Sequence, residues 1–355
     1  MSSRRSAVLS IAVAGIACAL AACAADGGGS AAGPDDATVA SPSPTTAAAA
    51  GFPVTVTSCG TTTTLESPPE RIVTIKSSAT EMVIALGAGD RLVGTAFSDG
   101  PLPEGVTEPP VLAERNPSRE AVLDLAPDLV YAGWESNLSD DGAGERAGYE
   151  DLGIATFVSP SACQDPQYQP DPLTSEDVFA EIEQVGELLG AQEEAAALVT
   201  EQRSALDAVP AAGEGLSALW YSSGSDTPFV GAGIGAPQMI MSAVGLDNIA
   251  DDVADTWTSL SWEVVADRDP DVLVLVDSAW NTAEHKVEVL ESNPVTAALP
   301  AVQEGRYLTV PFPATEAGVR NVSAVQDLAR QLDDLRTRLP DDLPDRRPDT
   351  SEATP

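Results

Sequence analysis

The chain has 355 residues, of which 43% are hydrophobic, enough to bury a core in each of two domains of ordinary size. Its 55 acidic and 18 basic side chains give a formal net charge of −37, which argues against nucleic acid as a partner because phosphates would be repelled. The composition also excludes a disordered protein, and the acidic balance is explained most simply as keeping an exported protein soluble.

The first 23 residues are predicted to be a lipoprotein signal peptide. Two arginines precede an apolar run that is too short to span a bilayer, and small residues follow it. Leu20-Ala-Ala-Cys23 resembles the lipobox of bacterial lipoproteins, which implies cleavage before Cys23 and acylation of its thiol. Cys18 is the alternative anchor, but Gly15 stands where an aliphatic residue is expected. We therefore expect an extracytoplasmic protein, lipid-anchored to the outer face of the cell membrane.

Two segments of biased composition flank the part of the chain that is expected to fold. Residues 24–51 are rich in Gly, Ala, Ser, Thr, Pro and Asp, and are predicted to be a flexible tether reaching roughly 30 Å. Residues 341–355 are rich in Pro and Asp and are predicted to be a disordered tail.

Cys59 and Cys163 are the cysteines that remain beside Cys23 after cleavage. In an oxidising compartment such a pair is most simply a disulfide, which would contribute on the order of 4 kcal/mol by closing a long loop. A zinc site is less favoured, because His285 is the only histidine of the chain. We expect no metal site and no resident cofactor.

Residues 52–173 are predicted to form a first α/β lobe. An edge hairpin over 52–64 precedes a buried strand over 71–75, and Ser78 with Glu81 fits a capping box for the helix that follows. A strand over 91–96 leads into a loop over 97–101. Ligands of α/β folds collect at the edge where such strands end, so both the helix start and this loop are candidate site elements.

A segment that occurs twice organises the rest of the chain. Residues 120–128 and 263–271 share Glu, Val, Asp, Pro and Asp at the same offsets. In each copy a short helix ends near the proline, which lacks a backbone donor, and an apolar strand follows. Two matching helix–strand units imply two similar α/β lobes with a cleft between them.

Two helices are predicted between the lobes, within residues 174–210. The second, over 191–209, would be about 27 Å long and would act as a rigid spine. Residues 211–340 are predicted to form the second lobe, which ends in an amphipathic helix over 322–338. The fold class is therefore α/β, with two Rossmann-like lobes joined by a single long backbone helix and a ligand cleft between them.

Aromatic rings are the first candidates for ligand contact, because several fall at or just after predicted strand ends, although a buried aromatic usually belongs to a core. Trp262 is expected to pack, since it directly precedes a helix. Trp134, Trp257 and Trp280 lie in loops and are expected to line the cleft. The full set of ligand-contacting rings is Tyr131, Trp134, Trp220, Tyr221, Trp257 and Trp280.

Two further features suggest anion binding, each with a simpler alternative. Lys76 follows a buried strand beside a helix start and could receive an anionic ligand group, or it could be a solvated strand end. Gly231-Ala-Gly-Ile-Gly235 could approach a phosphate with its backbone donors, but a tight turn is the better explanation.

The chain resembles a known family over about residues 52–339. The resemblance rests on the motifs around the first strand and helix, the repeated unit and the last loop: Arg71-Ile-Val-Thr-Ile-Lys76, Glu81-Met-Val-Ile-Ala-Leu-Gly87, and Val319-Arg-Asn321. These are similar to the substrate-binding lipoproteins of ABC importers for iron–siderophores, haem and cobalamin, the helical-backbone periplasmic binding proteins. Residues 131–137, 141–146 and 159–163 are similar to an actinobacterial branch thought to import a deazaflavin cofactor precursor.

The resemblance implies roles for three more residues. Glu120 and Glu263 correspond to carboxylates that contact an arginine of the membrane permease, although each would also stabilise a helix N-terminus. Arg320 lies in the loop where the family presents a basic side chain to its ligand. The family moves little between its free and bound states.

The preferred function is capture of an iron–siderophore, haem, corrinoid or deazaflavin-type ligand and its delivery to an ABC permease dimer by a monomeric protein. A flat, partly anionic molecule is expected. The alternatives are an exported enzyme of the same architecture or a surface adaptor lipoprotein. An enzyme would need a nucleophile–base pair or a metal, and the sequence offers no catalytic residue.

Overall fold

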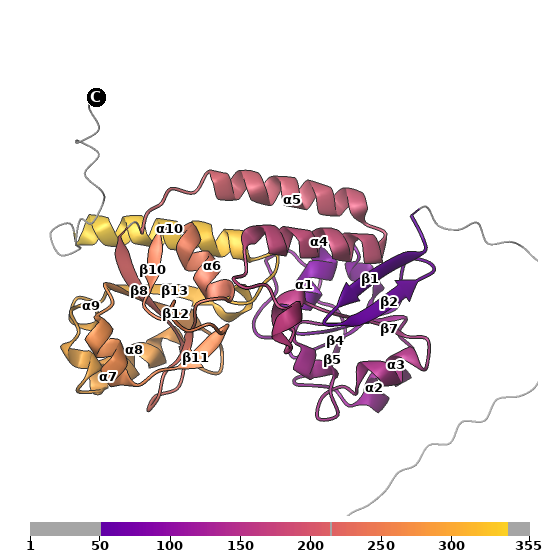
Figure 1. The fold of residues 1–355 in the computed structure, drawn as a ribbon, viewed down its shortest axis with the longest axis horizontal. Helices are drawn as coiled ribbons and strands as arrows, with labels where there is room; N and C mark the ends of the chain where they lie inside the picture. The colour runs from indigo at the N-terminus through magenta and orange to yellow at the C-terminus, as the bar shows by residue number, and fades with distance from the viewer. Residues whose placement is uncertain (1–50, 214, 340–355) are drawn as a thin grey trace, which may run out of the picture. The chain divides into compact units, whose positions relative to one another are not determined.

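The computed structural model describes residues 51–213 and 215–339 (Figure 1). The predicted signal peptide, Cys23, nearly all of the tether and the acidic tail lie outside this part. Among the described residues, no helix is both long and apolar enough to cross a membrane.

The first sheet is built entirely from parallel strands, in the order β5-β4-β3-β6-β7. Its strands are buried on both faces at their centre, which explains why they read as continuous apolar runs. A separate antiparallel hairpin has alternating burial and cross-strand threonine pairs, such as Thr55 with Thr64. The strands are β1 Val54–Ser58, β2 Thr61–Leu65, β3 Ile72–Ile75, β4 Leu92–Ala96, β5 Val111–Ala113, β6 Leu129–Ala132 and β7 Ala155–Val158.

The second sheet follows the order β11-β9-β8-β12-β13, and β10 also pairs with β8. Strands β10, β8, β12 and β13 run parallel, whereas β9 and β11 are antiparallel to their neighbours. The strands are β8 Leu216–Ser223, β9 Phe229–Gly231, β10 Leu246–Asn248, β11 Trp257–Ser259, β12 Val272–Asp277 and β13 Tyr307–Pro311.

Helices cover both sheets. The α-helices are α1 Ser77–Ala85, α2 Arg119–Asp124, α3 Arg146–Glu150, α4 Ser175–Leu189, α5 Gln192–Asp207, α6 Ala236–Ala243, α7 Trp262–Arg268, α8 Ala283–Ser292, α9 Pro300–Gln303 and α10 Asn321–Arg338. Short 3-10 helices are η1 Gly89–Arg91, η2 Glu135–Leu138, η3 Pro160–Ala162, η4 Pro166–Tyr168, η5 Thr296–Ala298 and η6 Phe312–Ala314. Local sequence sets several ends: Thr174 and Asp177 form a reciprocal cap on α4, which Gly190 closes with a left-handed backbone.

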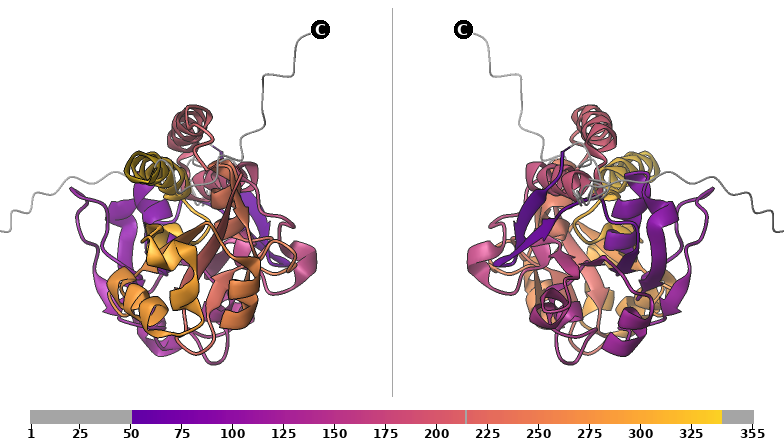
Figure 2. Two further views of the ribbon diagram at one scale, coloured as in Figure 1. Left: turned by 90° about the vertical axis from the view of Figure 1, so that its left-hand side faces the viewer. Right: turned by 90° about the vertical axis from the view of Figure 1, so that its right-hand side faces the viewer.

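Helix α5 corresponds to the predicted spine, and its 16 residues extend about 24 Å. It packs on α4, which lies against the first sheet's helix α1, and on α10, which lies against β13 of the second sheet. The end views place α5 over both of these helices (Figure 2). One hydrophobic cluster runs from the hairpin through α4 and α6 to α10, so the two-lobed fold shares a continuous core. The division at residues 52–173, 174–210 and 211–340 remains our proposal for its domains.

Cys59 and Cys163 form a disulfide, as predicted. The bond joins the turn between β1 and β2 to the segment after β7, across 104 positions of sequence. It therefore fixes the hairpin to the edge of the first sheet that also contributes to the site described next.

Candidate ligand-binding cavity

A cavity of about 750 Å³ lies where the two sheets present their strand ends. From the first sheet it is lined by residues that directly follow β4, β6 and β7, namely Phe97, Gly133 and Ser159. From the second sheet it is lined by the end of β8 and by residues that follow β12 and β13. Parallel strands bring their carboxyl ends to one edge, so residues distant in sequence converge there.

Three pairs of aromatic rings form much of the cavity wall. Phe97 and Trp134 meet edge-to-face at 5.6 Å between centroids, Trp280 and Phe312 do so at 5.8 Å, and Phe229 stacks on Trp257 at 5.7 Å. Trp280 is 58% exposed and Phe229 is 40% exposed. Large apolar rings left open to solvent inside a concave surface are the usual mark of a binding site.

Of the predicted ligand contacts, Trp134, Trp257 and Trp280 line this cavity. Trp134 and Trp280 lie in loops that leave strands, as predicted, whereas Trp257 is the first residue of the edge strand β11 and not a loop residue. Phe97, Phe229 and Phe312 line it as well and were not predicted. The same criterion, a ring just after a strand, would have found Phe97 and Phe312 had it been applied to phenylalanine.

Tyr131, Trp220 and Tyr221 do not line the cavity, which corrects their prediction as ligand contacts. They lie within β6 and β8, central strands covered on both faces, and each is at most 2% exposed. The Tyr131 hydroxyl donates to Glu181 Oε1 at 2.9 Å, and the Tyr221 hydroxyl donates to the Gly224 carbonyl. Their rings therefore belong to the core.

Lys76 also differs from its prediction, because its ammonium group is completely buried behind the wall. It forms an ion pair with Asp99, lies 3.6 Å from Glu316 Oε1, and lies 3.5 Å from the centroid of the Trp134 ring. Both carboxylates come from the protein itself. Lys76 is thus already neutralised and is not free to receive an anionic ligand group.

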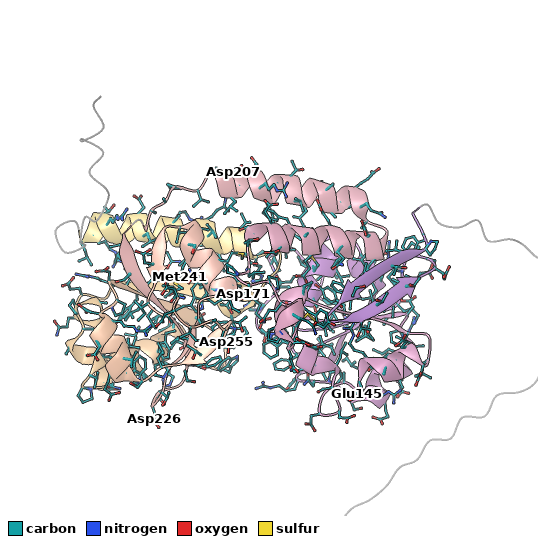
Figure 3. All side chains as sticks on the ribbon, in the orientation of Figure 1. Glu145, Asp171, Asp207, Asp226, Met241 and Asp255 are labelled. Carbon is teal, nitrogen blue, oxygen red and sulfur yellow. A yellow bond between two sulfur atoms is a disulfide. The ribbon has the colours of Figure 1, made fainter. Side chains whose placement is uncertain are left out.

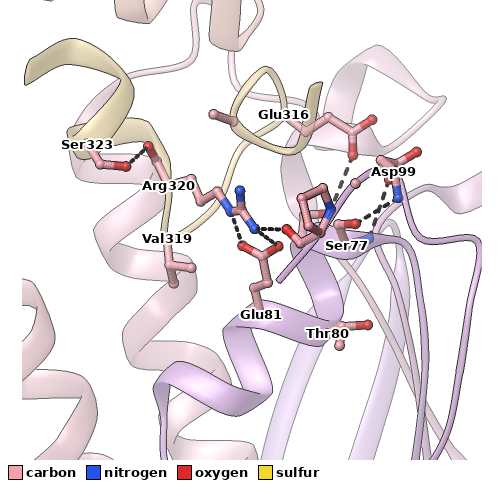
Figure 4. A network of polar contacts seen from close by, with 12 residues as sticks. Ser77, Thr80, Glu81, Asp99, Glu316, Val319, Arg320 and Ser323 are labelled. Carbon is pink, nitrogen blue, oxygen red and sulfur yellow. Dashed lines mark hydrogen bonds and ion pairs between the residues drawn. The ribbon is translucent and has the colours of Figure 1, made fainter. Parts of the chain in front are cut away.

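Arg320 is likewise occupied by the protein and is absent from the cavity wall. Its guanidinium forms an ion pair with Glu81 and donates to the Pro101 carbonyl at 2.7 Å (Figure 4). Burial raises the pKa of Glu81, and Arg320 opposes that rise. The predicted Ser78–Glu81 capping box is therefore wrong: Glu81 pairs with Arg320, and α1 has no side-chain cap.

The glycine loop after β9 fits the tight-turn explanation. A Cβ on Gly233 would come within 2.2 Å of the Asp251 carbonyl oxygen, and one on Gly235 would lie 3.0 Å from that of Thr256. These glycines permit close backbone packing against the following loop. Gly235 also lines the cavity, at the start of α6.

Glu181 is a buried carboxyl beneath the wall, on α4. It accepts hydrogen bonds from Tyr131 and from Ser159 Oγ, the latter at 2.9 Å, and Ser159 itself lines the cavity. Desolvation raises the pKa of Glu181 from 4.5 to about 7, although both hydrogen bonds lower it. The folded protein therefore binds one more proton here than the unfolded chain between about pH 4.5 and 7.

We expect this proton to make stability fall as pH rises through that window. The carboxyl's contribution is complete below its unfolded pKa and is lost as pH passes its folded pKa near 7, about 3 kcal/mol at most. Glu181→Gln should remove this part of the pH dependence, because its amide can accept from Tyr131 and donate to Ser159. Urea unfolding from pH 5 to 8 measures it, with exposed Glu183→Gln on the same helix as the control. Identical profiles for both variants would contradict the assignment.

Glu120 and Glu263 occupy equivalent, exposed positions, each the second residue of its helix. Ser118 and Ser261 cap the two helices by accepting from Ala121 N and Val264 N. In both cases hydrogen bonds from the residue's own backbone amide and from the capping serine lower the pKa of the glutamate. Each lobe thus presents one ionised carboxylate in the same local setting.

Comparison with known proteins gives a consistent result. Residues 72–314 match the family model described as periplasmic binding protein. An uncharacterized ABC transporter substrate-binding lipoprotein of Bacillus subtilis, YvrC, is 26% identical over 79% of this chain and 86% of its own length. A cobalamin-binding protein of Halobacterium salinarum is 33% identical over 64% of this chain and 60% of its own. The crystal structure of an ABC-type Fe³⁺-hydroxamate transport system from Saccharomonospora viridis matches with a TM-score of 0.67, at 26% identity, over 79% of this chain and 99% of that one.

Proposed function

We propose that this chain, which belongs to the periplasmic binding protein family, captures an organic ligand or metal chelate and delivers it to an ABC permease. The observation that carries the proposal is the cavity, whose three aromatic pairs come from the strand ends of both sheets. Six aromatic rings around one cavity suit a ligand with large apolar surfaces better than a small sugar or amino acid.

The relatives support a ligand of this size class. One is named for cobalamin and another for a ferric hydroxamate, and both are bulky organic metal complexes. We propose a ligand from the group formed by iron–siderophores, haem, corrinoids and deazaflavins. The metal chelates of this group bring their own metal, a deazaflavin needs none, and no cluster of metal-ligating side chains occurs among the described residues.

The relative named as a lipoprotein supports a location of this chain at the membrane surface. We propose that Cys23 carries a lipid, that the folded part acts as a monomer at the outer face of the membrane, and that Glu120 and Glu263 contact the permease.

An enzyme on the same architecture is the second candidate, and the site does not favour it. His285 lies away from the cavity wall with its side chain 59% exposed, and its partner is Glu288 at 3.6 Å. The described cavity wall holds no histidine for a nucleophile–base pair. An adaptor role would leave the aromatic cavity without a purpose.

Native mass spectrometry of the protein purified from its own host tests the function. We expect a bound organic chromophore that quenches tryptophan fluorescence on rebinding. Repeated recovery of a sugar or a peptide would refute the proposal.

Replacing Trp280 with alanine should weaken binding of that chromophore about tenfold. The ring is exposed within the cavity, so its loss removes ligand contact worth about 1–2 kcal/mol and little folding energy. Leu152→Ala serves as the control, because Leu152 is 56% exposed but does not line the cavity. Calorimetric titration measures both, and equal affinities for the two variants would remove Trp280 from the site.

A further inference from the structure

Carboxylates outnumber cations along the cavity wall. Four acidic residues line it, Asp99, Asp171, Asp255 and Glu316, and Arg115 is the single basic residue in the described wall. Adding Lys76, which lies just behind, leaves an excess of two negative charges when all six groups are ionised, and of one when Glu316, whose pKa burial raises to about 7, is protonated. The site thus has the opposite charge from the one that the sequence suggested.

Two of the three cations considered for this site, Lys76 and Arg320, are already engaged by carboxylates of the protein. Lys76 pairs with Asp99 and Glu316, and Arg320 pairs with Glu81 (Figure 4). Arg115 lies with its guanidinium 5.2 Å from the Phe97 centroid. A phosphate or carboxylate entering this cavity would therefore find Arg115 as the one basic side chain of the described wall and would lie beside four acidic residues, which is unfavourable.

The aromatic pairs also favour cationic ligands over anionic ones. The face of an aromatic ring is electronegative and attracts cations, as Lys76 shows by its position over Trp134. Asp171 and Asp255 lie exposed at the cavity, and Figure 3 shows both near the middle of the molecule. Ring faces and carboxylates together form a receptor for hydrogen-bond donors and positive charge.

The described wall also lacks the side chains that commonly serve as axial ligands of haem iron. Its described lining contains no histidine, tyrosine or methionine, and the sulfur of Cys163 is held in the disulfide. A haem with a free axial position would find no ligand from these residue types. A chelate whose metal is already saturated has no such requirement.

We propose that the ligand is an uncharged or cationic organic compound, either a flat ring system or a saturated chelate, that turns its donor groups to Glu316, Asp171 and Asp255. This rests on the proposed function and narrows it, because it removes polyanionic ligands and free haem. The large negative charge of the whole chain would favour the approach of the same class.

Two pairs of probes that differ in charge test the proposal. Riboflavin and its phosphate ester FMN share one ring system, and ferrioxamine B carries a free ammonium that N-succinylation replaces with a carboxylate. In tryptophan-quenching titrations we expect the less negative member of any binding pair to bind at least about tenfold more tightly. Equal or tighter binding of the anionic member would overturn this inference while leaving the proposed function intact.

Variants of the two exposed carboxylates show whether the cavity causes the preference. Asp171→Asn with Asp255→Asn should reduce the ratio of affinities several-fold. Asp226→Asn removes a charge from an exposed position outside the cavity wall, at the lower edge in Figure 3, and should leave the ratio unchanged. A ratio that survives the double change would overturn the assignment to these residues.

If none of the four probes binds, the chromophore released from the protein purified from its own host decides the question. Its net charge at pH 7, measured by capillary electrophoresis, supports the inference if zero or positive and overturns it if negative. If the protein yields no organic ligand and none of the probes binds, the proposed function fails with it.

Discussion

Reversing both of the exposed helix carboxylates, by Glu120→Arg with Glu263→Arg, is expected to reduce ligand uptake by cells more than about a hundredfold. In the proposed dock, each glutamate pairs with an arginine of the permease. Close charge pairs across protein interfaces couple by about 1.5–7 kcal/mol, and the two substitutions would replace both pairs by repulsion. Ligand affinity should stay within about twofold, because neither residue lines the cavity. Uptake of labelled ligand by cells that express the variant measures the first effect, and titration of the purified protein measures the second.

The first turn of α5 offers a matched control. Glu193 and Glu194 are exposed acidic residues of a helix N-terminus, so changing both to arginine alters the net charge and the helix dipole interaction equally. In Figure 1, α5 lies on the opposite side of the fold from α2 and α7. Uptake that is reduced equally by this control would show that general charge, rather than a two-point dock, is responsible.

Replacing Lys76 with methionine should lower the free energy of unfolding by about 3–5 kcal/mol. Methionine keeps much of the apolar stem, but the change leaves the Asp99 carboxylate, 4% exposed, without its cation in a buried position. Glu316 also loses a cation that holds its pKa down against the effect of burial. Urea unfolding at pH 7.5 gives the change, with an unaltered denaturant slope as the sign that both states keep their size.

Two further variants locate the cause of that loss. Lys76→Met combined with Asp99→Asn should recover a large part of it, because the unpaired charge is then removed. Arg203→Met breaks the pair with Glu176, whose side chains are 49% and 68% exposed, and should cost less than about 1 kcal/mol. If Lys76→Met also costs less than about 1 kcal/mol, the buried contacts of Lys76 with Asp99 and Glu316 do not stabilise the fold.

Local patterns were sufficient to predict the architecture. The repeated Glu-to-Pro-Asp unit marks the helix–strand passages at α2–β6 and α7–β12, and each passage belongs to a different sheet. A proline that ends a helix and a run of apolar residues that forms a buried strand act within a few neighbouring residues, so they can be read directly along the chain. The disulfide followed from compartment and cysteine number alone.

The composition of the site depended on contacts between segments far apart in the chain. Trp134 and Tyr131 are three residues apart, yet one lines the cavity and the other lies in the core, because β6 ends between them. Lys76 pairs with Asp99, 23 positions away, and also lies beside Glu316, whereas Arg320 pairs with Glu81; both glutamates lie more than 200 positions from their partners. Sequence therefore determined that rings and cations gather at the strand ends, whereas only the packed lobes decided which cations remain available. Burial makes an unpaired charge costly, so the folded chain supplied the carboxylates that neutralise its own lysine and arginine.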